Sequence, residues 1–289
     1  MNWSVALRLG RVSNLSTVWT NVLAGACLSG AVLDPGLVAA LMLAMSLFYV
    51  AGMYFNDAFD AGYDRIHRPG RPIPAGAVSL ITVFVSGAAF ILAGLAILLL
   101  VGLGPAHTGF SGLAGGVALC VAIIVYDIWH KDNPLGPVVM GLCRALVYGT
   151  VAASLAGRLP APLLGAAAMA LCYLIGLTYA AKQEDLVQPG NLWPLLFLAA
   201  PLVYGAPVAL QSGIGALVYA GLFMTVVYAV HLMRRQGRAA IPRVVGMLIA
   251  GICLLDALFV VAAGHPMLGL LAACGFAATL LFQRVIPGT

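Results

Sequence analysis

The chain has 289 residues, of which 63% are hydrophobic and only 8% are charged, with a formal net charge of +5. Soluble globular domains are about 45–50% apolar and about 25% charged, so this chain has too few charges to cover a water-facing surface. The composition excludes a soluble enzyme, a disordered segment and a nucleic-acid-binding domain. It leaves a polytopic membrane protein.

Apolar stretches follow one another along the whole chain. Because a membrane-spanning helix needs about 20 mostly apolar residues, we expect spans at 15–33, 36–56, 78–103, 109–127, 136–157, 161–182, 192–211, 213–232, 244–263 and 266–284. These ten apolar segments predict an all-α bundle that forms one integral membrane domain over residues 1–289. The last four segments are closely spaced. The alternative that one of them is re-entrant or lies in the membrane interface therefore stays open.

The positions of lysine and arginine predict how this bundle lies in the membrane. In the ten-span order, every basic residue except Arg144, inside the fifth span, and Arg158 falls on one side. The positive-inside rule makes that side cytoplasmic. We therefore expect a bacterial-type inner (plasma) membrane protein, surrounded by lipid, whose cytoplasmic loops 57–77, 128–135 and 183–191 form a polar cap.

The acidic residues gather on the same side, at the ends of the second, fourth and sixth spans. Seven of the nine belong to this group: Asp57, Asp60, Asp64, Asp127, Asp132, Glu184 and Asp185. Topology signalling has no use for carboxylates, because lysine and arginine set the orientation. Three neighbouring clusters of acids and cations therefore indicate a binding or catalytic site.

The cluster after the second span has the spacing of a metal site. Asn56, Asp60 and Asp64 are four residues apart, which places them on one face of a continuing helix. Carboxylate and amide oxygens suit Mg²⁺, which takes the rest of its shell from water and substrate phosphates. Arg68 and Arg71 follow in a proline-rich loop and offer planar donors to phosphate. The pattern predicts a Mg²⁺–diphosphate site; the alternative is a solvated loop that only sets topology.

The same stretch resembles a motif of the UbiA superfamily of intramembrane aromatic prenyltransferases. The motif NDxxDxxxDxxxRPxRPxPxG is matched at every specified position from Asn56 to Gly76. The resemblance implies about nine transmembrane helices around a central cavity that opens to lipid, one fewer than the ten segments counted. It also implies Mg²⁺-dependent transfer of a polyprenyl group from polyprenyl diphosphate to a small acceptor within the membrane, and the aromatic prenyltransferases of the superfamily suggest an aromatic one.

The cluster after the fourth span contains Tyr126, His130 and Lys131. The resemblance implies that Lys131 is a diphosphate ligand, and a lysine supplies a strong point charge for phosphate. We interpret His130 as an interfacial residue. Tyr126, together with Tyr179 at the end of the sixth span, is expected to line the cavity beside the allylic carbocation.

The cluster after the sixth span departs from the family pattern. Gln183 stands where the first aspartate of a second DxxxD motif is expected, and Glu184 and Asp185 are adjacent rather than four residues apart. We predict Glu184 and Asp185 as metal ligands and Lys182 as a diphosphate ligand. Three alternatives stay open: a single metal, replacement of the second metal by Lys182, or a chain that has lost catalysis.

Two ionisable residues lie within spans, where a charge is costly and usually functional. Arg144 is predicted to contact the diphosphate or an acceptor carboxylate; otherwise it is a structural partner of a carbonyl or a carboxylate. Asp256 is a site residue, or it is paired within the bundle or lies near the membrane interface.

The predicted function is therefore Mg²⁺-dependent prenyl transfer, and the alternative is a non-catalytic protein that binds or transports a polyprenyl lipid. The catalytic residues are predicted to be Asp60, Asp64, Lys131 and Arg144. The predicted substrate ligands are Asn56, Arg68, Arg71, Tyr126, Lys131, Tyr179 and Lys182, and the metal ligands Asn56, Asp60, Asp64, Glu184 and Asp185.

Overall fold

The structure, a computed structural model, describes residues 2–131, 133–183 and 193–288, and these ranges contain helices and no β-strand. In chain order the elements are α1 (Trp3–Leu9), η1 (Val12–Asn14), α2 (Leu15–Leu28), α3 (Pro35–Phe59), α4 (Ala61–His67), α5 (Leu80–Leu103), α6 (Ser111–Trp129), α7 (Gly136–Ala156), α8 (Ala161–Lys182), η3 (Trp193–Ala199), α9 (Ala200–Gln211), α10 (Gly213–Gln236), η4 (Gly237–Ala240), α11 (Ile241–Ala262) and α12 (Pro266–Phe282).

Within these described ranges, seven stretches are long and apolar enough to cross a membrane. One of them, Gly213–Ala262, is a helical hairpin of α10 and α11 that turns at Gly237, whose φ is 56°. The remaining two of the ten expected segments are shorter helices, α2 with 14 residues and α12 with 17. The predicted all-α membrane bundle is confirmed, although the first segment ends at Leu28 rather than residue 33.

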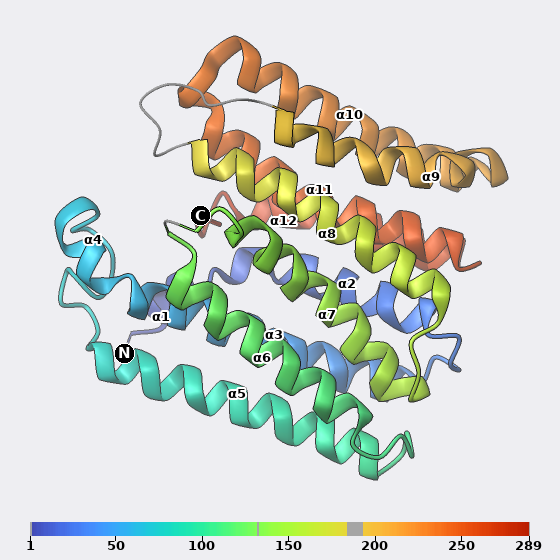
Figure 1. Ribbon diagram of the computed structural model, residues 1–289, viewed down its shortest axis with the longest axis horizontal. Helices are drawn as coiled ribbons and strands as arrows, with labels where there is room; N and C mark the ends of the chain where they lie inside the picture. Colours follow the sequence, from blue (N-terminus) through green and yellow to red (C-terminus); the bar gives the residue numbers. More distant parts are fainter. Residues whose placement is uncertain (1, 132, 184–192, 289) are drawn as a thin grey trace.

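The helices run up and down, so that alternate connections meet at one end of the bundle (Figure 1). Both termini, α4, the α6–α7 connection and the α10–α11 turn lie at the left end in this view. The α5–α6, α7–α8 and α11–α12 connections lie at the opposite end. This arrangement brings the first two predicted polar clusters to the same end.

A buried carboxylate links α2, α7 and α11 at the centre of the bundle. Asp256 of α11 is fully buried and accepts hydrogen bonds from Thr20 of α2, at 2.6 Å, and from Tyr148 of α7. A buried charge is tolerated when polar groups surround it. The expectation that Asp256 is paired within the bundle is therefore correct.

Glycines on α5 receive aromatic side chains from α3. A Cβ atom at Gly94 would lie 2.8 Å from the ring of Phe48, and one at Gly87 would lie 2.8 Å from the ring of Phe55. Small residues of this kind let transmembrane helices approach closely. Gly94 and Gly87 thus fix how α3 and α5 pack together.

The Gly94–Phe48 contact makes a stability prediction. Gly94→Ala should destabilise the bundle by about 1–3 kcal/mol, because the added methyl group overlaps the Phe48 ring. Gly221→Ala is the matched control, since its Cβ would meet Leu254 at an ordinary 3.6 Å. Reversible unfolding in mixed detergent measures the free energy of unfolding of both variants. Equal values for the two would contradict this packing.

Candidate active site

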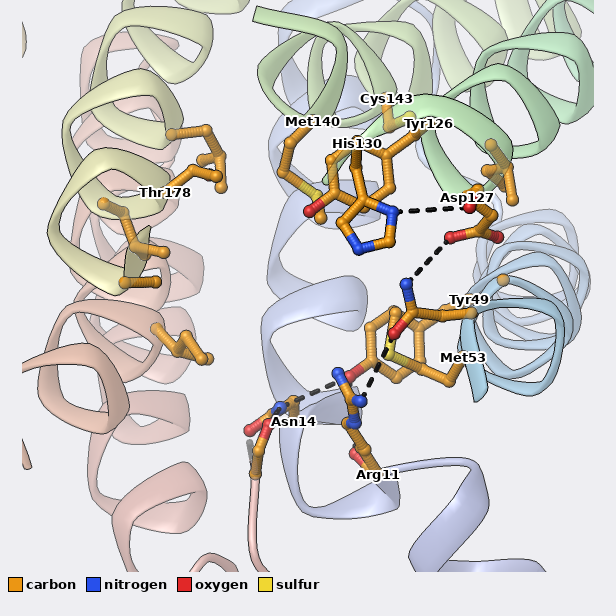
Figure 2. A pocket seen from close by; sticks show the side chains of 18 of the residues that line it. Arg11, Asn14, Tyr49, Met53, Tyr126, Asp127, His130, Met140, Cys143 and Thr178 are labelled. Carbon is orange, nitrogen blue, oxygen red and sulfur yellow. Dashed lines mark hydrogen bonds between the residues drawn. The ribbon is translucent and has the colours of Figure 1, made fainter. Parts of the chain in front are cut away.

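A cavity of about 760 Å³ opens among α2, α3, α6, α7, α8 and α11 at the end of the bundle that carries the termini. Polar side chains line its outer part and apolar ones its inner part. In Figure 2, Thr178 of α8 lies across the cavity from Tyr126, Asp127 and His130 at the end of α6. Arg11, Asn14 and Tyr49 form a further part of the wall.

The predicted acidic column is present at the end of α3. The backbone amide of Asp60 donates to the carbonyl of Asn56 at 3.0 Å, and that of Asp64 donates to Asp60 at 2.9 Å. Helical hydrogen bonding therefore continues from α3 into α4, and the predicted loop 57–77 is partly helical. Asn56, Asp60 and Asp64 are all buried and line the cavity.

Two arginines neutralise one edge of this column. Arg71 Nη1 lies 3.1 Å from Asp57 Oδ1 and 3.0 Å from Asp64 Oδ2, so it bridges the two carboxylates. Arg11 Nη2 contacts Asp57 Oδ1 at 3.2 Å and Asn56 Oδ1 at 3.4 Å. The proline-rich loop and the N-terminal segment thus meet at the end of α3.

Lys131 neutralises the other edge of the column. Its Nζ lies 2.8 Å from Asp60 Oδ1 and 3.7 Å from the ring centre of Tyr63. His130 Nε2 lies 3.7 Å from Asp60 Oδ2. His130 also lines the cavity beside the column, and its interpretation as an interfacial residue stays a prediction.

Asp127 adds a third carboxylate to the cavity wall, beside Asp60 and Asp64. Its Oδ1 accepts a hydrogen bond from Asn56 Nδ2 at 3.2 Å. Its Oδ2 is buried and has no hydrogen-bond partner within the described part of the chain. Such an atom is costly unless a donor or a cation satisfies it.

The other predicted ligands also line the cavity: Arg68, Tyr126, Tyr179 and Lys182. The ring of Tyr126 stacks on His130 with centroids 5.0 Å apart. Lys182 Nζ donates to the Asn133 carbonyl at 2.8 Å, which joins the end of α8 to the α6–α7 connection. Gln183 is buried in the cavity wall. Glu184 and Asp185 lie outside the described residues.

Arg144 lies deeper in the cavity, on α7. It donates to the Thr17 carbonyl at 3.1 Å and to Thr17 Oγ1 at 2.8 Å. This corresponds to the alternative of a structural partner for a carbonyl, while Arg144 still faces the cavity.

The sequence places Asp57 and Asp127 in the acidic clusters without giving either a role as a ligand, and it gives Arg11 no place in the site. Arg11 was counted only as a basic residue before the first span, and no spacing links it to residue 57. Its backbone is left-handed, with φ of 42°, at the break between α1 and η1. Asp57 is a specified position of the matched motif, and this could have identified it as a site residue. It does not belong to the column of residues spaced four apart.

The model of the UbiA prenyltransferase family matches residues 17–188, which contain all three polar clusters. The chain belongs to this family. The digeranylgeranylglyceryl phosphate synthase of Methanoculleus marisnigri is 33% identical over 150 residues, 51% of this chain and 50% of the relative. That of Pyrococcus horikoshii is 46% identical over 104 residues, 35% of each chain. The chain thus spans about half or less of the length of these UbiA-like relatives.

Solved structures show the same fold. A UbiA homologue from Aeropyrum pernix K1 superposes with a TM-score of 0.68 over 85% of this chain and 97% of that one, at 19% identity. A UbiA homologue from Archaeoglobus fulgidus, bound to DMAPP and Mg²⁺, gives a TM-score of 0.59 over 87% and 99%, at 13% identity. The UbiA fold of the bundle is therefore established.

The donor set of the UbiA site fits a hard divalent cation. The side chains of the site offer carboxylate and amide oxygens, and Asp127 Oδ2 has no hydrogen-bond partner among the described residues. Within the described residues, no three His, Cys, Asp or Glu side chains are grouped closely enough to form a metal site by themselves. This is the arrangement that Mg²⁺ uses when one or two carboxylates and substrate phosphates share its coordination.

The Arg71 bridge makes a prediction about stability. Arg71→Met should destabilise the protein by about 1–3 kcal/mol, because it leaves Asp57 and Asp64 buried beside an apolar side chain. Adding Asp64→Asn should recover part of this loss, and a double-mutant cycle measures the coupling. Arg65→Met on the exposed side of α4 is the control. Additive effects of the two site substitutions would contradict the bridge.

Proposed function

We propose that this UbiA-family protein transfers a polyprenyl group from a polyprenyl diphosphate to a small acceptor within the membrane, with Mg²⁺ as cofactor. The observation that carries the proposal is the pairing of acids and bases at the mouth of an apolar cavity. The polar end suits a charged leaving group and its metal. The apolar inner part suits the hydrocarbon chain.

The charges of the site are complementary to those of magnesium diphosphate. Asp60 and Asp64 are buried and already paired with Lys131 and Arg71. Burying such pairs costs desolvation energy, which their mutual attraction only partly offsets. A ligand that carries both a cation and a polyanion can replace these pairs, because the acids then face the metal and the bases face phosphate oxygens.

In this proposal Asn56, Asp60 and Asp64, with Asp127 beside them, hold the metal. Arg68, Arg71, Lys131 and Lys182 bind the diphosphate, and Arg11 stands close enough to join them. The bond between the allylic carbon and the diphosphate oxygen breaks, and negative charge grows on that oxygen. Mg²⁺, when bound, acts as a Lewis acid for this charge. The arginines and lysines stabilise the same charge through preorganised donors.

The organic half of the reaction takes place in the apolar part of the cavity. The allylic cation left behind must be shielded from water until an acceptor nucleophile bonds to its terminal carbon and loses a proton. Tyr126 and Tyr179 line the cavity and can face this cation with their rings. Arg144, held by Thr17, stays a predicted ligand of the diphosphate or the acceptor.

Two classes of acceptor are compatible with the proposed transfer. The family resemblance predicts an aromatic acceptor, whereas the names of the relatives indicate that they form a prenylated glyceryl phosphate. An assay that offers the protein a phenolic acid and, separately, a monoprenylated glyceryl phosphate distinguishes aromatic acceptors from glyceryl phosphate acceptors. The acceptor that becomes prenylated identifies the class.

We also propose that the site faces the cytoplasm. The end of the bundle that carries the site holds every described lysine and arginine except Arg144 and Arg158, as the positive-inside rule requires. Trp129 and Trp193 are exposed at this end, as expected of an interfacial aromatic belt. The bacterial type of the membrane stays a prediction from the sequence.

The proposal predicts Mg²⁺-dependent release of diphosphate from an allylic prenyl diphosphate by the purified protein in the presence of acceptor. Asp60→Asn should lower this rate about 100-fold or more, because it removes a metal ligand at the developing charge. Diphosphate release and prenylated product are measured together by a coupled assay and mass spectrometry.

Asp34→Asn is the matched control. Asp34 caps the far end of α3 through a 2.8 Å bond from the Leu37 amide, and an asparagine keeps that cap. This variant should retain full activity. Absence of diphosphate release with every donor and acceptor would favour instead a protein that binds or transports a prenyl lipid.

A further inference from the structure

We propose that Tyr63 of α4 positions Lys131 for the diphosphate, by holding the ammonium group of the lysine against the face of its ring. The inference rests on the proposed function, in which Lys131 is a ligand of the diphosphate. Tyr63 is a positioning residue rather than a catalytic one, because its ring acts through the lysine. The proposal stands on the contact between the ring and the ammonium group, on the stacking that fixes the ring, and on the fact that a phenol ring carries no charge.

The ammonium group of Lys131 contacts a ring and a carboxylate at the mouth of the cavity. Its Nζ lies 3.7 Å from the centre of the Tyr63 ring and 2.8 Å from Asp60 Oδ1. A cation within about 6 Å of a ring centre is attracted by the negative face of the ring. All three side chains line the cavity. The contact therefore joins α4 to the α6–α7 connection where the diphosphate is proposed to bind.

The Tyr63 ring is fixed by a second stacked ring. His67, one turn further along α4, stacks on Tyr63 with ring centroids 4.0 Å apart and an angle of 16° between the planes. His67 Nδ1 lies 3.1 Å from the carbonyl oxygen of Tyr63, and this contact fixes the position of the imidazole. Since the stacked imidazole covers one face of the phenol, the ammonium group of Lys131 approaches the opposite face. A turn of the Tyr63 ring away from Lys131 would break the stack.

The ring and the carboxylate respond differently when the substrate binds. Asp60 is a proposed metal ligand, so its carboxylate turns from Lys131 to Mg²⁺ in the substrate complex. The Tyr63 ring is neutral, so it competes neither with phosphate for the ammonium group nor with Asp60 for the metal. An ammonium group has three N–H donors, and those that do not point at the ring can bond phosphate oxygens. The ring is therefore the partner that Lys131 keeps.

The contact between the ring and the ammonium group gains strength in the substrate complex. In the free protein it is open to water, because Tyr63 is 39% exposed and the Lys131 side chain 34%. A prenyl diphosphate at the mouth of the cavity covers both groups. Cation–π attraction is stronger between desolvated groups than between exposed ones. The ring thus contributes to the affinity for the diphosphate and not only to the structure of the free protein.

The first test observes the contact in the ligand-free, full-length protein by NMR. The chain has only two lysines, Lys131 and Lys182. Reductive methylation with ¹³C-formaldehyde labels both and keeps their positive charge, and Lys131→Arg and Lys182→Arg assign their signals. The ring current of residue 63 should shift the Lys131 methyl signal upfield in the wild type and in Tyr63→Phe. This shift should disappear in Tyr63→Leu, while the Lys182 signal, the internal control, should stay in place.

The second test measures by calorimetry how tightly the unmethylated protein binds a non-reactive prenyl thiodiphosphate at fixed Mg²⁺. Tyr63→Leu should bind about three- to tenfold more weakly, which is the gain in cation–π attraction between exposed and desolvated sites. Tyr63→Phe should stay within about twofold of the wild type, because phenylalanine keeps the ring face. Stepwise fluorination of a phenylalanine at residue 63 should weaken binding progressively, since fluorine withdraws negative charge from that face. A purely structural role would not produce this series.

Lys131→Met and Phe59→Leu are the controls for the binding test. In the Lys131→Met background, Tyr63→Leu should have no further effect on affinity, because the ring acts through the ammonium group. Phe59 is an exposed ring one turn before Tyr63, and it packs on Phe84 of α5 with centroids 5.3 Å apart. It does not line the cavity. Phe59→Leu should therefore keep the wild-type affinity and the wild-type Lys131 signal.

The outcomes separate the role of Tyr63 from the transferase assignment. The role of Tyr63 is overturned by an unshifted Lys131 signal in the wild type, by equal affinity of Tyr63→Leu and the wild type, or by a Tyr63→Leu effect that persists without Lys131. Prenyl transfer by the wild type leaves the transferase assignment standing in each of these cases. A wild-type protein that binds the thiodiphosphate as described but transfers no prenyl group overturns the transferase assignment and supports the role of Tyr63. A wild-type protein that does not bind the thiodiphosphate at all overturns both.

Discussion

The ion pairs at the end of α3 are the interaction on which the rest of the site depends. Asp57 lies in the last turn of α3, Asp60 at its C-terminal end and Asp64 in α4, and all three are buried. Carboxylates at this depth need cations, because a buried unpaired charge costs several kcal/mol. Arg71 and Lys131 supply them at 2.8–3.1 Å from elements far apart in the chain.

The up-and-down topology of the UbiA bundle makes this pairing possible. It brings the N-terminal segment, the α3–α4 junction and the α6–α7 connection to one end of the bundle (Figure 1). Below them a cavity extends between helices whose other faces form a packed core. Charged side chains thus line one end of the cavity and apolar side chains the other. This arrangement matches a prenyl diphosphate, which has a charged head and a hydrocarbon chain. The central Asp256 network holds the helices α2, α7 and α11 around that space.

Features set by local spacing were predictable from the sequence, and features set by packing between helices were not. The ten apolar segments and the column of Asn56, Asp60 and Asp64 follow from hydropathy and helical periodicity. The contact of Arg11 with Asp57 depends on a left-handed residue and on how α1 meets α3. The anchoring of Arg144 by Thr17 depends on α2 and α7 lying side by side, which no motif encodes.

We infer that the ion pairs of this cluster separate when the substrate binds. The acids then contact the metal, and the bases contact the diphosphate. The most direct measurement is a crystal structure with Mn²⁺ in place of Mg²⁺ and a prenyl thiodiphosphate, with the metal located by anomalous scattering. The account predicts a metal peak beside Asp60 and Asp64, with Lys131 and Arg71 turned to phosphate oxygens. A diphosphate bound elsewhere, with Arg71 still bridging Asp57 and Asp64, would contradict it.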